Sequence, residues 1–175
     1  MKLEELLIDS LTRAAAQVFS TMLDVQVRCG STSTERGLPQ ANDGVVSFIG
    51  LAGAWAGTGS LACSPVMACR ICSQMLMTEQ TAVNEDVLDA VAELTNMIIG
   101  GVKTDLEPHL GQLGLSIPTV IFGRNFKTKG AGGAEWIVTP FFWDEDALLA
   151  KVCLTRSEKS LAHATVLDPT CHLDF

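Results

Sequence analysis

Residues 84–107 read NEDVLDAVAELTNMIIGGVKTDLE, and this stretch has the periodicity of one long amphipathic helix. Asn84 can cap the helix, and two acidic residues follow in the first turn, where the helix dipole favours anions. Pro108 has no backbone N–H to donate, so we expect the helix to end near Glu107. The apolar positions predict a buried stripe formed by Val87, Leu88, Val91, Leu94, Ile98, Val102 and Leu106.

The residues before this helix predict another helix, a strand, a hairpin and a short second helix. Residues 2–22 have helical periodicity, and residues 25–29 alternate like a strand. Residues 31–43 are polar and contain Gly and Pro, which favours a loop or a ragged edge. Two apolar runs around a turn of small residues predict a β-hairpin, and Ser64-Pro65 is typical of a helix start. These elements are expected as strands 45–51 and 57–63 and helix 65–77.

The residues after the long helix predict three more strands, at 119–123, 135–143 and 148–155. The expected element order is therefore αβββααβββ. This order implies an α+β domain of two layers, with a mainly antiparallel sheet and helices packed on it. Its two halves have a similar order, which suggests an ancient duplication. We assign residues 1–155 to the domain and the polar residues 156–175 to a loosely ordered tail.

The composition argues against several classes of protein. The chain has 175 residues, enough for one domain with a substantial core. Its net charge of −8 argues against binding to nucleic acid or to anionic membranes, which attract clustered Lys and Arg. No apolar run reaches the roughly 20 residues of a spanning helix, and the charged N-terminus is not typical of a signal peptide. We therefore expect a cytoplasmic protein whose six cysteines are reduced.

The long helix also carries a polar stripe, formed by Asp86, Asp89, Glu93, Asn96, Gly100 and Lys103. On charge pattern alone, a solvated helix face is the better interpretation. Three details favour a functional site. Asn96 lies mid-helix, where Asn is a poor helix former. Gly100-Gly101 costs the helix roughly 1–2 kcal/mol, which a close approach of another molecule would explain. Glu93 and Asn96 lie one turn apart, so a carboxylate and a carboxamide project side by side.

The spacing Asp89-x3-Glu93-x2-Asn96, followed after 21 residues by Pro118, resembles the signature of the CheC/CheX/FliY family of chemotaxis phosphatases. The adjoining stretches DAVAELTNMIIGG and LSIPTVIFG are similar to that family as well. So are AAAQVFSTMLDVQV in the first helix and strand, the hairpin SFIGLAGAWAGTGSLACS, and the last strands EWIVTPFF and LLAKVCL. The resemblance covers about residues 8–155.

The resemblance implies a CheC-like fold and a phosphatase that acts on the aspartyl phosphate of a phosphorylated CheY-like receiver. The receiver would supply a bound Mg²⁺ and a Lys, so no cofactor or metal of this chain's own is expected. An amide cannot act as a base, but Asn96 would orient the attacking water, and Glu93 would pair with the receiver's Lys. Asp89, Gly100 and Gly101 would contact the partner. Pro118 would have a structural role at the start of the following strand.

The first helix lacks this pair of residues. Aligned by Asp9, it has Arg13 and Ala16 where the long helix has Glu93 and Asn96. Neither Arg nor Ala can do the proposed work, so we expect one site per chain, as in CheX rather than in the two-site CheC. The CheX branch pairs through sheet edges, so the resemblance also implies a homodimer.

Two other functions compete with the phosphatase. A binding or scaffold module for a receiver or a flagellar-switch protein would use the same fold without the chemistry. Cys69-Arg-Ile-Cys72 raises the possibility of a metal or redox site. However, zinc needs four ligands, no histidine falls at ligand spacing, and the predicted helix is apolar, so core packing is the better interpretation. The tryptophans are expected in the core or at a dimer interface.

Overall fold

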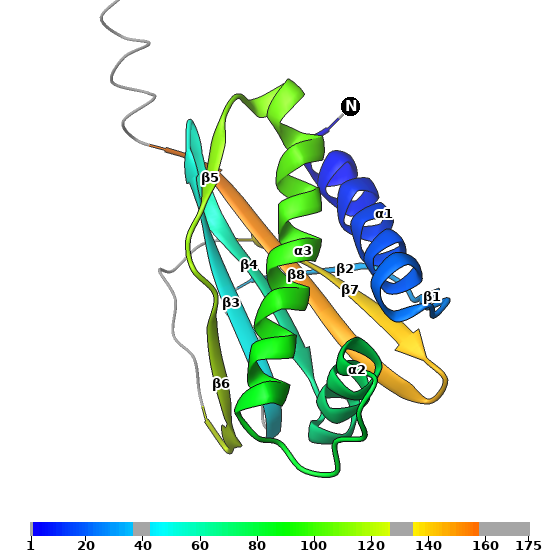
Figure 1. The fold of residues 1–175 in the computed structure, drawn as a ribbon. Coiled ribbons are helices and arrows are strands. Elements are labelled where there is room, and N and C mark those ends of the chain that lie inside the picture. The colour runs from blue at the N-terminus through cyan, green and yellow to red at the C-terminus, as the bar shows by residue number, and fades with distance from the viewer. Residues whose placement is uncertain (1, 37–42, 127–134, 158–175) are drawn as a thin grey trace, which may run out of the picture.

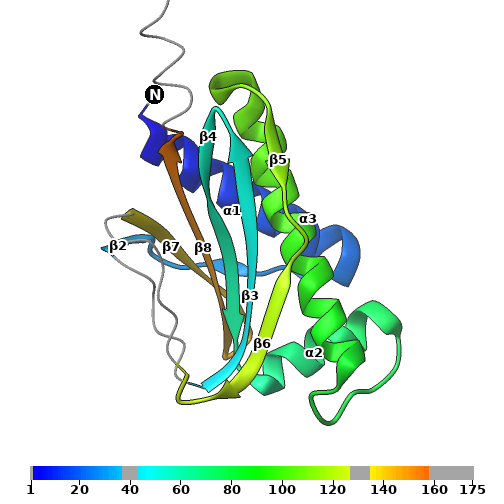
Figure 2. The ribbon, with the colours of Figure 1, turned by 90° about the vertical axis from the view of Figure 1, so that its left-hand side faces the viewer.

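The computed structural model describes residues 2–36, 43–126 and 135–157, and within them it shows one antiparallel sheet of eight strands with three helices (Figure 1). The helices lie together on one face of the sheet, as the view turned by 90° shows (Figure 2). The predicted α+β class is therefore confirmed. The segment 158–175, which is nearly all of the predicted tail, lies outside the described residues.

The helices begin where the sequence predicted. Their bounds are α1 (Leu3–Leu23), α2 (Pro65–Leu76) and α3 (Glu85–Leu110). At the start of α2, the hydroxyl of Ser64 accepts a hydrogen bond from the backbone N–H of Met67 at 3.1 Å. At the start of α3, the side-chain oxygen of Asn84 accepts from the N–H of Val87 at 3.0 Å. Both caps satisfy backbone donors that the first helical turn leaves free.

The end of α3 differs from the expectation, because the helix continues past Pro108 to Leu110. The backbone N–H of Gly111 donates to the carbonyl of Glu107 at 3.0 Å. Pro108 therefore removes one hydrogen bond from the last turn without ending the helix. A proline so close to a helix end interrupts little of the ladder, which is why the prediction was wrong by one turn.

The eight strands form a sheet in the order β1-β7-β8-β4-β3-β5, in which β2 also pairs with β7 and β6 also pairs with β3. Every pairing is antiparallel. The predicted hairpin 45–63 is confirmed as β3 and β4. The strand bounds are β1 (Arg28–Cys29), β2 (Ser33–Arg36), β3 (Asp43–Gly53), β4 (Trp55–Cys63), β5 (Leu113–Leu115), β6 (Thr119–Arg124), β7 (Glu135–Trp143) and β8 (Asp146–Arg156).

Two strands were missed, so the predicted order αβββααβββ is corrected to αββββααββββ. One is β2, which lies in the stretch expected to be a loop or a ragged edge and is an outer strand of the sheet. All four of its residues are exposed, so only its ladder with β7 makes it a strand. The other is β5, which is three residues long and pairs with the end of β3. β2 contains no apolar residue, and β5 is too short for the alternation of Leu113, Gly114 and Leu115 to predict a strand.

The observed order repeats in the two halves of the chain. Each half contains a long helix, two short strands and a long hairpin. The short strands β1 and β2 pair with β7 of the other half, and β5 and β6 pair with β3 of the first half. The two hairpins meet through β4 and β8 at the centre of the sheet. Each half thus completes the sheet of the other, which agrees with the duplication that the sequence suggested.

The core lies between the sheet and the helix layer, with α3 against the sheet. Six of the seven predicted core positions of α3 are fully buried, and Leu88 is half-buried. A Cβ added at Gly59 of β4 would lie 2.6 Å from the side chain of Ile99, so glycine there lets α3 approach the strand closely. Within the described residues, no helix is long and apolar enough to cross a membrane.

Candidate active site

The polar stripe of α3 borders an open groove of about 530 Å³. One wall is α3, which contributes Asp89, Ala92, Glu93 and Asn96. The other wall is the link between β5 and β6, residues 116–118. Pro118 lies in this wall directly before β6, so the fold brings the last residue of the sequence signature to the other three.

The side chains of Glu93 and Asn96 are free to act on another molecule. Glu93 is exposed and Asn96 is half-buried at the groove. Among the described residues, no side-chain hydrogen bond or ion pair involves either of them. Other polar residues of α3 are engaged, since Lys103 pairs with Glu107 at 2.9 Å and the hydroxyl of Thr95 donates to the carbonyl of Val91. The helix therefore presents a carboxylate and a carboxamide together, one turn apart.

The opposite wall is tied to the sheet through Ser116. Its backbone N–H donates to the carbonyl of Gly50 in β3 at 2.9 Å, and its hydroxyl accepts from the N–H of Gly50 at 2.8 Å. The same hydroxyl donates to the carbonyl of Ile117 at 3.0 Å. Sequence reasoning missed Ser116 and Ile117, although they are the two residues that precede Pro118. Their place before Pro118 is the only sequence feature that could have indicated them. The hydrogen bonds of Ser116 to Gly50 join distant parts of the chain and leave no local pattern.

The two glycines predicted to contact a partner lie in different surroundings. A Cβ at Gly100 would have one neighbour, the side chain of Leu115 at 3.9 Å, so there is space around it. A Cβ at Gly101 would lie 2.9 Å from the Cβ of Ala14 in α1. The close neighbour of Gly101 is thus α1 of the same chain. The tight packing of α1 against α3 explains why position 101 is a glycine.

The equivalent face of α1 is occupied by an ion pair. Arg13 contacts Asp9 at 3.1 Å and Asp105 of α3 at 3.0 Å. Where α3 presents Glu93, α1 therefore has a cation bound to its neighbouring helix. At the positions that match Glu93 and Asn96, α1 therefore has the ion-paired Arg13 and Ala16, which are neither a carboxylate nor a carboxamide.

Comparison with known proteins identifies the family of the chain. The family model described as chemotaxis phosphatase CheX matches residues 45–142, which include all of α3 and Pro118. The chain belongs to the CheX family. The CheY-P phosphatase CheX of Thermotoga maritima is 28% identical over 142 residues, which cover 80% of this chain and 90% of that protein.

Solved structures share the CheX-family fold. A CheC-like superfamily protein from Shewanella sp. PV-4 has a TM-score of 0.77 and 24% identity, covering 89% of this chain and 99% of the other. A chain of the CheX–CheY–BeF3–Mg²⁺ complex from Borrelia burgdorferi has a TM-score of 0.72 and 23% identity, covering 85% and 97%. At these identities the likeness establishes the fold alone.

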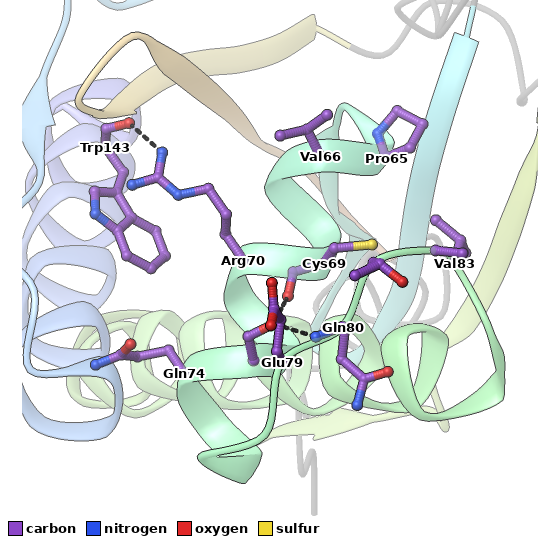
Figure 3. Close-up of a pocket in the computed structure, with 12 residues that line it drawn as sticks. Pro65, Val66, Cys69, Arg70, Gln74, Glu79, Gln80, Val83 and Trp143 are labelled. Carbon is purple, nitrogen blue, oxygen red and sulfur yellow. Dashed lines mark hydrogen bonds between the residues drawn. The ribbon is translucent and has the colours of Figure 1, made fainter.

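A second cavity of this CheX-family chain, of about 420 Å³, lies beside α2 and the turn between β7 and β8 (Figure 3). Its only described cation is already engaged, because Arg70 contacts Asp144 and Asp146 at 2.7 Å each. The guanidinium of Arg70 also lies 4.1 Å from the centre of the Trp143 ring. These contacts tie α2 to the β7–β8 turn, which is a structural role.

Of the five cysteines that the structure describes in this CheX-family chain, Cys63, Cys69, Cys72 and Cys153 are buried, as core residues are, and Cys29 is exposed. Burial raises the pKa of the Cys63 thiol to about 12 and also raises the pKa of Cys69 and of Cys72. Protonated thiols are poor nucleophiles and poor metal ligands. Among the described residues, no three His, Cys, Asp or Glu side chains are grouped to hold a metal ion.

Proposed function

We propose that this chain hydrolyses the aspartyl phosphate of a phosphorylated CheY-like response regulator. The observation that carries the proposal is the free pair Glu93 and Asn96 at the groove of α3, in a chain of the CheX family. The name of the Thermotoga maritima relative, a CheY-P phosphatase, supports the same substrate class.

Asn96 orients the attacking water in this proposal. Its carboxamide has both donor and acceptor atoms, and none of them is engaged within the described chain. The water oxygen bonds to phosphorus as the bond between phosphorus and the aspartate oxygen breaks. The products are inorganic phosphate, which keeps the water's protons or releases one to solvent, and a free carboxylate on the receiver. Catalysis of this kind depends on positioning more than on covalent chemistry.

Glu93 fixes the docking register by pairing with a Lys of the receiver. Asp89 lies one turn before it on the same groove and adds negative charge there. Gly100 leaves the next turn open for the partner, whereas Gly101 supports the site only by letting α1 pack against α3.

Mg²⁺ arrives with the receiver rather than with this chain. The Borrelia burgdorferi complex, which holds CheX, CheY, BeF3 and Mg²⁺ together, supports this assignment. A metal there would neutralise charge on the phosphoryl group.

Sheet edges are the surfaces through which we propose that two copies pair. In the described residues, β2 and β6 are outer strands, each paired with one neighbour. An unpaired strand edge has free backbone donors and acceptors that a second edge can satisfy.

The test of the activity is to mix the chain with a phosphorylated CheY-like receiver of the same organism and Mg²⁺. The expected result is faster release of inorganic phosphate than from the receiver alone. Binding of the phosphorylated receiver without faster release would overturn the proposal and favour the non-catalytic scaffold.

A further inference from the structure

An exposed apolar side chain stands at the rim of the groove, across from the polar pair. Ile117 is 87% exposed and lines the same groove as Glu93 and Asn96. We propose that Ile117 is a specificity-determining contact that the receiver covers when it docks, and that Ser116 is the residue that positions it. This inference rests on the proposed function, because it names a further part of the same docking surface.

The backbone that carries Ile117 is held in place before any partner arrives. Ser116 bonds to both the N–H and the carbonyl of Gly50, at 2.8 and 2.9 Å, and Pro118 restricts the backbone on the other side. A Cβ at Gly50 would lie 3.3 Å from the hydroxyl oxygen of Ser116, so glycine at position 50 leaves room for these two hydrogen bonds.

Rigidity makes Ile117 a favourable contact. Isoleucine is branched at Cβ and has few χ1 rotamers, so ordering it costs little side-chain entropy. A partner that covers it gains the burial of an apolar side chain and loses little conformational freedom. The side chain of Ile117 lies outside the core, so it does not stabilise the fold by being buried.

The position of Ile117 indicates that the receiver is the molecule that covers it. A protein that places a phosphoryl group at Asn96 must enter the groove that Ile117 also lines. Across the groove, Asp89 and Glu93 give the surface a charged side beside an apolar one. The fitting partner therefore presents a cation next to an apolar patch, and apolar centres with polar margins are typical of such interfaces.

The experiment compares Ile117→Ser with Val66→Ser. Val66 is also branched at Cβ and exposed, but it lines the second cavity rather than the groove. Binding is measured to a CheY-like receiver of the same organism loaded with Mg²⁺ and beryllofluoride, and hydrolysis is measured on the phosphorylated receiver. Thermal unfolding checks that both variants fold.

Ile117→Ser is expected to raise Kd and KM about tenfold or more while kcat stays within about twofold, and Val66→Ser is expected to change none of them. Ser116→Ala should also raise Kd, and Ser116→Thr, which keeps the hydroxyl, should restore it. An unchanged Kd for Ile117→Ser overturns the inference, as does a loss confined to kcat. A change in self-association alone would instead assign Ile117 to a contact between two copies of the chain, which also overturns it.

The same design separates this inference from the proposed function. If the wild-type chain binds the receiver through Ile117 but does not speed hydrolysis, the proposed function fails and the inference stands. If hydrolysis is fast and Ile117→Ser matches the wild type, the inference fails alone. A wild-type chain that neither binds nor hydrolyses contradicts both.

Discussion

At the scale of single residues, the site depends on which polar groups of α3 the fold already uses. Lys103 pairs with Glu107, and Thr104 bonds back to the carbonyl of Gly100. Glu93 and Asn96 have no such partner among the described residues. Their spacing predicted this pair, because positions three apart share a helix face. Ser116 could not be predicted, because its partner Gly50 lies 66 residues away and leaves no local pattern.

Reversing the charge of Glu93 tests its pairing with the receiver. Glu93→Lys should lower kcat/KM about tenfold to a hundredfold, because the receiver's Lys would then meet a like charge. Glu85→Lys alters another exposed carboxylate of α3, outside the groove, and should have little effect. Changing the receiver's Lys to Glu should recover part of the activity of Glu93→Lys. Equal losses in the Glu93 and Glu85 variants would contradict the pairing.

At the scale of elements, α1 and β5 hold α3 in position. Gly101 lets α1 pack closely, Arg13 joins α1 to Asp105, and the carboxylate of Glu107 accepts the backbone N–H of Leu113 at 3.0 Å. From sequence alone the two adjacent glycines looked alike. Their roles differ because Gly101 faces a neighbouring helix and Gly100 does not, and the sequence contains no information on which helix packs there.

Substituting each glycine by alanine separates these roles. Both changes gain about 0.5–1 kcal/mol of helix propensity. At Gly100 the space is open, so Gly100→Ala should raise the free energy of unfolding by up to that amount. Gly101→Ala should be about 1–3 kcal/mol less stable than Gly100→Ala, because its Cβ overpacks against Ala14. Urea unfolding measures both. Equal stabilities would show that α1 does not approach Gly101 closely.

The contact between α3 and β5 should depend on pH. The hydrogen bond from Lys103 lowers the pKa of Glu107 below the ordinary value for a glutamate, and the hydrogen bond from the N–H of Leu113 lowers it further. A carboxyl with a depressed pKa stabilises the fold above its unfolded pKa, and this contribution is lost as pH falls through the folded pKa. Glu107→Gln should therefore show a shallower loss of stability below about pH 4.5 than the wild type. Parallel stability curves for the two proteins would argue against the contact.

At the scale of the whole molecule, two intertwined halves build one sheet. The long apolar hairpins and the capped helices could be predicted, because periodicity and caps are local signals. The strands β2 and β5 could not, because they are short and exist only through pairing with β7 and β3. The location of Pro118 beside Asn96 likewise depends on the complete sheet, which carries the β5–β6 link along α3.

The proposed dimer is a property of the assembled sheet. Light scattering at micromolar concentration should give twice the mass of the 18.7 kDa chain. Placing a proline in an outer strand, as in Val120→Pro of β6 or Thr34→Pro of β2, removes an edge donor and should shift the dimer to monomer. A monomer at all concentrations for the wild type would contradict the pairing.

The central claim is that Asn96 orients the water that attacks the receiver's phosphoryl group. The most direct measurement is the single-turnover rate of phosphate release, with the chain in excess over a phosphorylated receiver and Mg²⁺, for the wild type and for Asn96→Ala. The account predicts that both proteins saturate at similar concentrations and that the maximal rate of Asn96→Ala is about a hundredfold lower. A maximal rate for Asn96→Ala equal to that of the wild type would contradict it.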